Sequence, residues 1–473
     1  MIQTRQKKNF TEGPISKPIF YYVLPMIASH LLQMAYSIAD SSAVGSLVGN
    51  NELAAVSAVS SFSGFILNII AGIAVGASVI IARSFGAKDE RGVERGVHTS
   101  MILSVIIGIA FMTVSLIICG PVIELYIKEP LYVPIAKRYM TIICLGIPAT
   151  AIYNFAAGAM RSLGETKIAL IIGSVTGLVN VGLNYTFILG FDGIGERGAA
   201  IATVIAQYLS ATAAVIYMFL RKRQPYALKM RKMCFDLRIV VESLKLGIPA
   251  GIQSSCLSLS NMVLNSSVTA LPPEANARIA QYANSIVHSV TGISWSVVTC
   301  YSSAITAYMG QNWGAGKFDR VKRGFGAIAL QGEIVLIAVV GLELISSPFL
   351  CRMFISSKAP VDETIALAIP LLAFVMVPYV LAIVMNLMQA MLRGLGYSTL
   401  PMVISLITVV GTRIVWSQFI FPLLTVDGNS IFRLYLCYII SYILTISSLG
   451  IYMMVKWRTI KENVSAASRL QKN

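Results

Sequence analysis

The sequence predicts an all-α polytopic membrane protein, with twelve transmembrane helices arranged as two pseudo-symmetric six-helix bundles. Three observations lead to this fold class: an apolar composition, apolar runs long enough to cross a bilayer, and short motifs that recur in both halves. Of the 473 residues, 56% are hydrophobic and only 12% are charged, and the mean hydropathy is +0.74. Soluble domains usually carry about a quarter charged residues, so the composition excludes an ordinary soluble protein.

Apolar runs recur along the whole chain, separated by charged or Gly/Pro-rich breaks. A bilayer core about 30 Å thick requires about 20 apolar residues in each crossing helix, and the runs reach that length. The expected spans, in order, are 18–46, 53–82, 97–120, 133–160, 168–190, 199–220, 239–269, 279–311, 324–347, 364–392, 400–422 and 431–455.

The net charge of +16 could suggest a nucleic-acid partner, but its distribution indicates membrane topology instead. With the N-terminus inside, most lysines and arginines fall in one set of loops, and such a bias marks the cytoplasmic side. We therefore expect a multi-pass protein of the plasma (inner) membrane, with both termini cytoplasmic and no nucleic-acid partner. The expected cytoplasmic segments are the N-terminal tail 1–17, the basic linker 221–238 and the C-terminal tail 457–473.

Short motifs of the first half return in the second half. SFGAKDERGVERG (Ser84–Gly96) aligns with NWGAGKFDRVKRG (Asn312–Gly324), and RSLGET (Arg161–Thr166) aligns with RGLGYS (Arg393–Ser398). Two pairs of prolines correspond in the same way: Pro25 with Pro249, and Pro148 with Pro378.

The repeat predicts an N-lobe, 18–220, and a C-lobe, 239–456, with six spans each. Because six is an even number, both lobes insert with the same orientation and should be related by an axis along the membrane normal. Two similar lobes with a pathway between them are typical of secondary transporters.

Sequence motifs of the common hydrolases are absent. The patterns GxxxxGK[ST], HExxH and GxSxG do not occur, and Gly314–Asp319 lacks the first glycine of the nucleotide-binding loop. The three histidines, at 30, 98 and 288, lie in separate segments, so no metal site is expected. We therefore expect neither an enzyme nor a cofactor, and uphill transport would draw on an ion gradient.

One carboxylate stands out in the first span. Between Lys17 and Glu52, Asp40 is the only charged residue. A carboxylate at a helix centre costs about 2.5–3.5 kcal/mol on insertion scales, and burial disfavours its charged form. Asp40 could therefore bind and release a proton, or coordinate Na⁺. The structural alternative is an aspartate near a helix end whose oxygens are satisfied by backbone or water.

Candidate partners for Asp40 lie in the fifth and sixth spans. Asn180 and Asn184 are four residues apart, so both amides share one helix face. Thr203 adds a hydroxyl in the next span. Polar residues in membrane helices also hold helices together, and that alternative stays open for each residue taken alone.

The C-lobe lacks a carboxylate equivalent to Asp40, because Asn265 occupies the aligned position. Its seventh and eighth spans are nonetheless polar, and we expect a substrate cavity there, with helix–helix hydrogen bonding as the alternative. Arg413 lies either in the cavity or near an interface. The candidate cavity residues of both lobes are Met34, Tyr36, Tyr153, Asn154, Gln253, Asn261, Asn265, Asn284, His288 and Asn386.

The order of the motifs resembles the MATE (multidrug and toxic compound extrusion) family. The matching features are LPxxxxxLLQxxYSxxDxxxVG (Leu24–Gly45), ARSFGAKD after the second span, the RSLG/RGLG pair and GAAIAT in the sixth span. The resemblance implies a V-shaped pair of bundles that exports organic, often cationic, compounds in exchange for H⁺ or Na⁺. It implies that Asp40 is the coupling group, with Asn180 beside it. Many relatives have a second aspartate where this chain has Asn184.

These features together predict a secondary active antiporter for multidrug efflux. It would extrude organic, cationic or amphipathic compounds (xenobiotics) by alternating access, with H⁺ favoured over Na⁺ as the coupling ion. Asp40, Asn180, Asn184 and Thr203 would form the ion-coupling site. The partners expected are the substrate, the ion and the lipid bilayer, and we expect a monomer. The alternatives are a lipid-linked oligosaccharide flippase and a narrow-specificity metabolite exporter of the same superfamily.

Overall fold

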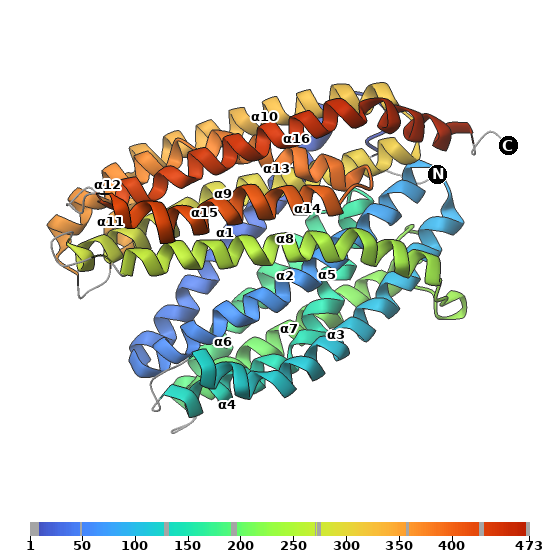
Figure 1. Ribbon diagram of the computed structural model, residues 1–473. Helices are drawn as coiled ribbons and strands as arrows, with labels where there is room; N and C mark the ends of the chain where they lie inside the picture. Colours follow the sequence, from blue (N-terminus) through green and yellow to red (C-terminus); the bar gives the residue numbers. More distant parts are fainter. Residues whose placement is uncertain are drawn as a thin grey trace. The chain divides into compact units, whose positions relative to one another are not determined.

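The computed structural model describes residues 9–47, 50–126, 132–190, 196–269, 271, 276–355, 359–424 and 430–469. Side chains are described throughout these ranges except at 37–61, 125–126, 188–190, 196, 430 and 464–469. The described residues form helices and short connections, and none of them belongs to a strand (Figure 1). This confirms the predicted all-α fold class.

The chain divides into two compact units. Unit 1 contains Phe20–Ser255 and Gly310–Ala315, and unit 2 contains Gly13–Ile19, Cys256–Met309 and Gly316–Asn473. The division runs through α8, so the first part of that helix belongs with unit 1. The lobe limits expected from the sequence remain a prediction.

The first unit is built from long apolar helices. Their bounds are α1 Ser16–Leu47, α2 Asn50–Gly86, α3 Glu90–Tyr126, α4 Tyr132–Leu145, α5 Ile147–Ser162, α6 Lys167–Gly190, α7 Glu196–Leu220, the short η1 Met230–Lys232 and α8 Leu237–Thr269. Buried side chains of α2, α3, α4 and α5, among them Ile70, Met140 and Phe155, form its core. Helices suit a bilayer because they satisfy every backbone polar group internally.

The remaining helices follow in chain order. They are α9 Ala277–Gly314, α10 Phe318–Ile345, α11 Ser347–Phe354, α12 Val361–Met376, α13 Tyr379–Gly394, α14 Thr399–Ser405, η3 Leu406–Gly411, α15 Thr412–Val415, η4 Trp416–Ile420, η5 Phe421–Leu423 and α16 Ser430–Arg469. The segments η3 and η4 are π-helical, and they flank the short α15.

Each of the twelve expected spans corresponds to a helix or a broken helix. Within the described residues, eight helices are long and apolar enough to cross a membrane, and two bent helix pairs bring the number to ten. The other two spans are α8 and α9, with 33 and 38 residues. These two helices carry the amide and histidine side chains considered below.

The sequence repeat is visible in the backbone at two places. The fourth span of each half is broken at its proline: α4 and α5 meet at 43° before Pro148, and α12 and α13 meet at 41° at Pro378. The RSLG and RGLG motifs end α5 and α13 with the same cap. In both, the glycine has positive φ, +85° at Gly164 and +88° at Gly396. In both, the next amide donates back to the residue five positions earlier, the hydrogen bond of a Schellman cap.

A third repeat makes a reciprocal contact inside unit 1. A Cβ atom at Gly86 would lie 1.9 Å from the carbonyl oxygen of Gln311, and one at Gly314 would lie 2.0 Å from that of Arg83. Arg83 and Gln311 are the equivalent residues that immediately precede the two aligned motifs. Each motif therefore places its glycine against the backbone next to the other copy.

The helices α2 and α8 cross through glycine pairs. Gly72 and Gly76 of α2 face Gly247 and Gly251 of α8, and a Cβ at Gly72 would lie 2.2 Å from the backbone nitrogen of Gly251. Small residues four apart let membrane helices approach closely.

The predicted linker 221–238 packs against α3. The backbone N–H of Lys229 donates to Nε2 of His98 at 3.0 Å, and the ammonium groups of Lys229 and Lys232 contact Glu94 at 3.1 and 3.0 Å. The linker is thus held to unit 1 by specific contacts.

Candidate functional site

The expected ion-coupling residues fall in unit 1, and three of the four are described there. Asp40 belongs to α1, but its side chain lies outside the described part of the structure. Asn184 of α6 is fully buried and donates to Oδ1 of Asn180 at 3.5 Å. Asn180 in turn donates to the hydroxyl of Thr203 on α7 at 3.4 Å, and that hydroxyl donates to the Ala199 carbonyl at 2.9 Å. The structure therefore brings Asn180, Asn184 and Thr203 together.

Tyr36 connects α1 to the same helix α6. Its hydroxyl donates to the carbonyl oxygen of Ser174 at 3.1 Å. Its ring lies over Gly177, where a Cβ atom would come within 2.2 Å of the ring. Only glycine allows this approach, and Asn180 follows three residues later on α6.

Two of the other candidates in unit 1 donate hydrogen bonds to backbone carbonyls. Tyr153 donates to the Ala169 carbonyl at 3.1 Å, and Asn154 donates to the Thr150 carbonyl of its own helix at 3.0 Å. Met34 is half-buried, and Gln253 is buried at 2% exposure within unit 1.

Unit 2 contains a pocket of about 290 Å³ between α8, α9, α12, α13, α15 and α16. Of the residues expected to line a C-lobe cavity, four do so: Asn261, Asn265, Asn284 and His288. Asn386 does not line it, and instead donates to the Ala382 carbonyl one turn earlier at 2.8 Å. The remaining lining residues are Leu257, Val287, Thr291, Gly292, Trp295, Val375, Tyr379, Met385, Arg413, Tyr435, Tyr438 and Tyr442.

Arg413 lies in the pocket wall, which decides between its two expected positions. The residue is 3% exposed. Its guanidinium donates to the side-chain oxygens of Ser260 at 3.3 Å, Asn261 at 2.5 Å and Tyr442 at 3.3 Å. It also stacks over the ring of Tyr438, with Cζ 4.2 Å from the centroid. Such stacking favours a desolvated cation.

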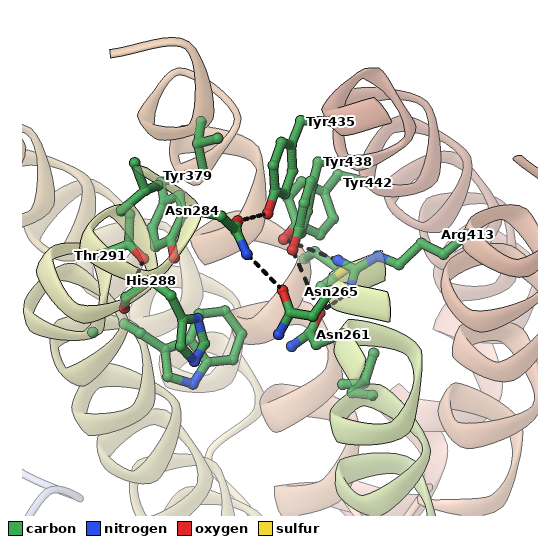
Figure 2. A pocket seen from close by; sticks show the side chains of 16 residues that line it. Asn261, Asn265, Asn284, His288, Thr291, Tyr379, Arg413, Tyr435, Tyr438 and Tyr442 are labelled. Atoms are coloured by element: carbon green, nitrogen blue, oxygen red, sulfur yellow. Dashed lines mark hydrogen bonds between the residues drawn. The ribbon is translucent and has the colours of Figure 1, made fainter. Parts of the chain in front are cut away.

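A second set of hydrogen bonds links three helices across the pocket. Tyr435 of α16 donates to Oδ1 of Asn284 on α9, and Nδ2 of Asn284 donates to Oδ1 of Asn265 on α8 at 3.1 Å. Figure 2 shows these contacts converging with those of Arg413 on one side of the pocket. Three tyrosines of α16 contribute rings to this wall, and Tyr435 and Tyr438 are stacked with centroids 5.3 Å apart.

The tyrosines and the buried carboxylate of Glu343 were not expected from the sequence. Tyr435, Tyr438 and Tyr442 follow a helical i, i+3, i+7 spacing, which was the available signal. Glu343 of α10 is 3% exposed, and its oxygens accept from the backbone N–H of Ser294 at 3.1 Å and from its hydroxyl at 2.5 Å. Among the described residues, no cluster of His, Cys, Asp or Glu could hold a metal ion.

A helical, multi-pass chain with a repeated architecture and a polar pocket within its bundle defines a membrane transport protein. Comparison with known proteins identifies the family to which the chain belongs. The family model MatE matches residues 25–186 and 249–419. The chain belongs to the MATE family, and it is a transport protein, not an enzyme.

The relatives and the solved structures agree with this assignment. The chain is 25% identical to the probable multidrug resistance protein YoeA of Bacillus subtilis (strain 168), over 86% of this chain and 87% of that protein. It is also 25% identical to the probable multidrug resistance protein NorM of Thermotoga maritima, over 85% and 84% of the two chains. An outward-facing structure of a multidrug resistance MATE family transporter superposes with a TM-score of 0.86, at 20% identity, over 97% of this chain and 100% of that one.

Proposed function

We propose that this protein is a secondary active antiporter that exports organic, cationic or amphipathic compounds in exchange for H⁺ by alternating access, with both termini in the cytoplasm. Family membership supports transport, and the names of the relatives support organic compounds as cargo. The absence of a nucleotide-binding motif in the sequence supports an ion gradient as the energy source.

The observation that carries the coupling mechanism is the contact between Tyr36 and Gly177 beside the Asn184–Asn180–Thr203 chain. Residues four apart share a helix face, so Asp40 shares the face of Tyr36 in a regular helix. We propose that Asp40 binds and releases the coupling proton. Asn180 would then reorient its amide, which can donate or accept as the carboxyl group changes its protonation state.

A single carboxylate favours H⁺ over Na⁺ in this chain. Hard cations such as Na⁺ are held by several oxygens, and relatives with a second aspartate in the fifth span would offer more charge than Asn184 does. Neutral amide oxygens balance the charge of a bound cation less well than carboxylate oxygens do. A proton needs only one carboxyl oxygen.

The test uses purified protein in liposomes loaded with a fluorescent organic substrate. We expect an inwardly directed H⁺ gradient to drive efflux and an equal Na⁺ gradient at fixed pH to leave it unchanged. Efflux driven by Na⁺ but not by H⁺ would overturn the ion assignment. Absence of efflux under both gradients, for both cationic and anionic dyes, would overturn the antiporter proposal itself.

A further inference from the structure

The pocket of unit 2 contains a buried positive charge, and none of the described residues that line it is acidic. Arg413 is 3% exposed, and none of the sixteen side chains drawn around the pocket is a carboxylate. Within the part of the chain that the structure describes, Arg413 forms no ion pair. An ionisable residue at such a depth in a membrane protein is costly and marks a functional site.

The nearby amides are oriented as hydrogen-bond donors toward the pocket. Arginine can only donate hydrogen bonds, so the atom of Asn261 that meets Arg413 is the carbonyl oxygen, and Nδ2 points elsewhere. Oδ1 of Asn265 likewise accepts from Asn284. Neither Nδ2 group donates to another described protein atom. Figure 2 shows both nitrogens turned toward the side of the pocket where His288 lies.

The backbone around Arg413 is itself unusual. The helical turn Thr412–Val415 lies between the π-helical stretches Leu406–Gly411 and Trp416–Ile420. The π-helix is rare and occurs frequently at functional sites. Because each π turn changes the helical phase, these stretches set the direction in which Arg413 leaves its helix.

The opposite side of the pocket offers aromatic surface. Trp295 and Tyr379 make an edge-to-face contact with ring centroids 6.4 Å apart, and both line the pocket together with Leu257 and Val287. Concave sites with apolar walls and a few convergent polar groups are the usual form of small-molecule sites. The wall therefore suits an aromatic or aliphatic body next to the charged end.

We propose that this pocket binds organic anions: a carboxylate, sulfonate or phosphate group beside Arg413 and the Nδ2 groups of Asn261 and Asn265, with an apolar or aromatic body against Trp295 and Tyr379. As a substrate site, it rests on the proposed export function and concerns the part of the amphipathic cargo that carries a negative group; it assigns no site to cationic cargo. In this pocket, Arg413 would repel a cationic compound. The guanidinium of Arg413 also stacks on one face of the Tyr438 ring, so that face is not open to a cationic ligand.

The binding test compares two probes with the same ring system and opposite charge. Naphthalene-1-sulfonate and 1-naphthylmethylammonium are titrated by calorimetry into the full-length protein in nanodiscs of phosphatidylcholine. We expect the sulfonate to bind at least tenfold more tightly than the ammonium compound. Equal affinities, or tighter binding of the ammonium compound, would overturn the proposal.

Two variants locate the effect. Arg413→Gln removes the charge, and Asn261→Asp neutralises it by placing a carboxylate at the position that Arg413 already contacts. Because Asn261→Asp converts a hydrogen bond into an ion pair, it keeps the fold if Arg413→Gln does not. We expect each folded variant to weaken sulfonate binding at least tenfold. Arg352→Gln, which removes an exposed charge from α11 of the same unit, should leave binding unchanged. Unchanged sulfonate binding in Asn261→Asp would refute the assignment.

The anion could be a soluble organic acid or the phosphate of a lipid headgroup. Nanodiscs containing phosphatidylglycerol separate an anionic lipid headgroup from a soluble anion when they are compared with phosphatidylcholine nanodiscs at about 1 M salt, which screens repulsion between the bilayer surface and the sulfonate: weaker sulfonate binding there assigns the site to the anionic lipid, and unchanged binding assigns it to a soluble anion. Either result supports an anion site. Binding is read without transport, so anion binding in a protein that fails to export would refute the proposed function and leave this inference standing.

Discussion

Replacing Gly72 with alanine should separate α2 from α8 and destabilise unit 1. The new Cβ would lie 2.2 Å from the backbone nitrogen and 2.4 Å from the Cα of Gly251, whereas ordinary contacts of a Cβ begin at 3.4 Å. Both opposing atoms are backbone, so no side chain can rotate away and the helices must shift by about 1 Å.

The magnitude follows from two opposing effects. Overpacking a tight contact costs about 1–3 kcal/mol, while alanine improves helix propensity by up to about 1 kcal/mol over glycine. We therefore expect Gly72→Ala to lower the free energy of unfolding by up to about 2 kcal/mol. Gly64→Ala is the matched control on the same helix, because a Cβ at Gly64 meets nothing within 4 Å. It should be neutral or slightly stabilising.

The assay is equilibrium unfolding in mixed detergent micelles, with SDS as denaturant and helicity as readout. The reasoning would be refuted if Gly72→Ala and Gly64→Ala unfolded at the same SDS fraction. It would also be refuted if Gly64→Ala were the more destabilised of the two.

Three further predictions test other parts of the structure. Gly396→Ala should destabilise the protein by about 1–2 kcal/mol, because φ is +88° there and a left-handed conformation costs an L-residue about that much. The control Gly326→Ala has open space at its Cβ and should not destabilise the protein. Equal thermal unfolding midpoints for the two variants would contradict this prediction. Glu343→Ala should lower the free energy of unfolding by about 1–3 kcal/mol, because it leaves the two donors of Ser294 unpaired. Glu343→Gln keeps an acceptor and should cost less. A Glu343→Gln variant less stable than Glu343→Ala would be inconsistent with the contact. Asn180→Leu should reduce H⁺-driven efflux in liposomes at least tenfold at matched protein content, and full activity would remove Asn180 from the coupling site.

The sequence predicted the fold well because a bilayer permits few alternatives. Apolar runs of sufficient length had to be helices, and the aligned motifs predicted a repeat that the structure shows as equivalent breaks at Pro148 and Pro378 and equivalent glycine caps at Gly164 and Gly396. These features depend on local sequence, so one chain suffices to find them.

The pocket could be predicted only in part. Asn261, Asn265 and Asn284 were expected because amides are conspicuous in apolar helices, and they do line the pocket. Arg413 could not be placed from sequence, since its direction depends on two π-helical stretches that have no clear sequence signal. The tyrosines of α16 were not predicted to line a pocket, because tyrosine is common both in protein cores and at membrane interfaces.

The contact between Glu343 of α10 and Ser294 of α9 was not expected from the sequence either. Sequence spacing alone cannot show this, because Glu343 and Ser294 lie on different helices. Their meeting depends on how α9 and α10 pack.

The most direct test of the central claim, proton-coupled export through Asp40, is dye accumulation in cells stripped of their own exporters. Native protein and Asp40→Asn are compared at matched membrane expression, with ethidium as the cationic dye and fluorescein as the anionic one. The account predicts that the native protein lowers accumulation of at least one dye and that Asp40→Asn does not. Equal export by both proteins would show that Asp40 is not the coupling group, and no export of either dye by the native protein would contradict the exporter itself.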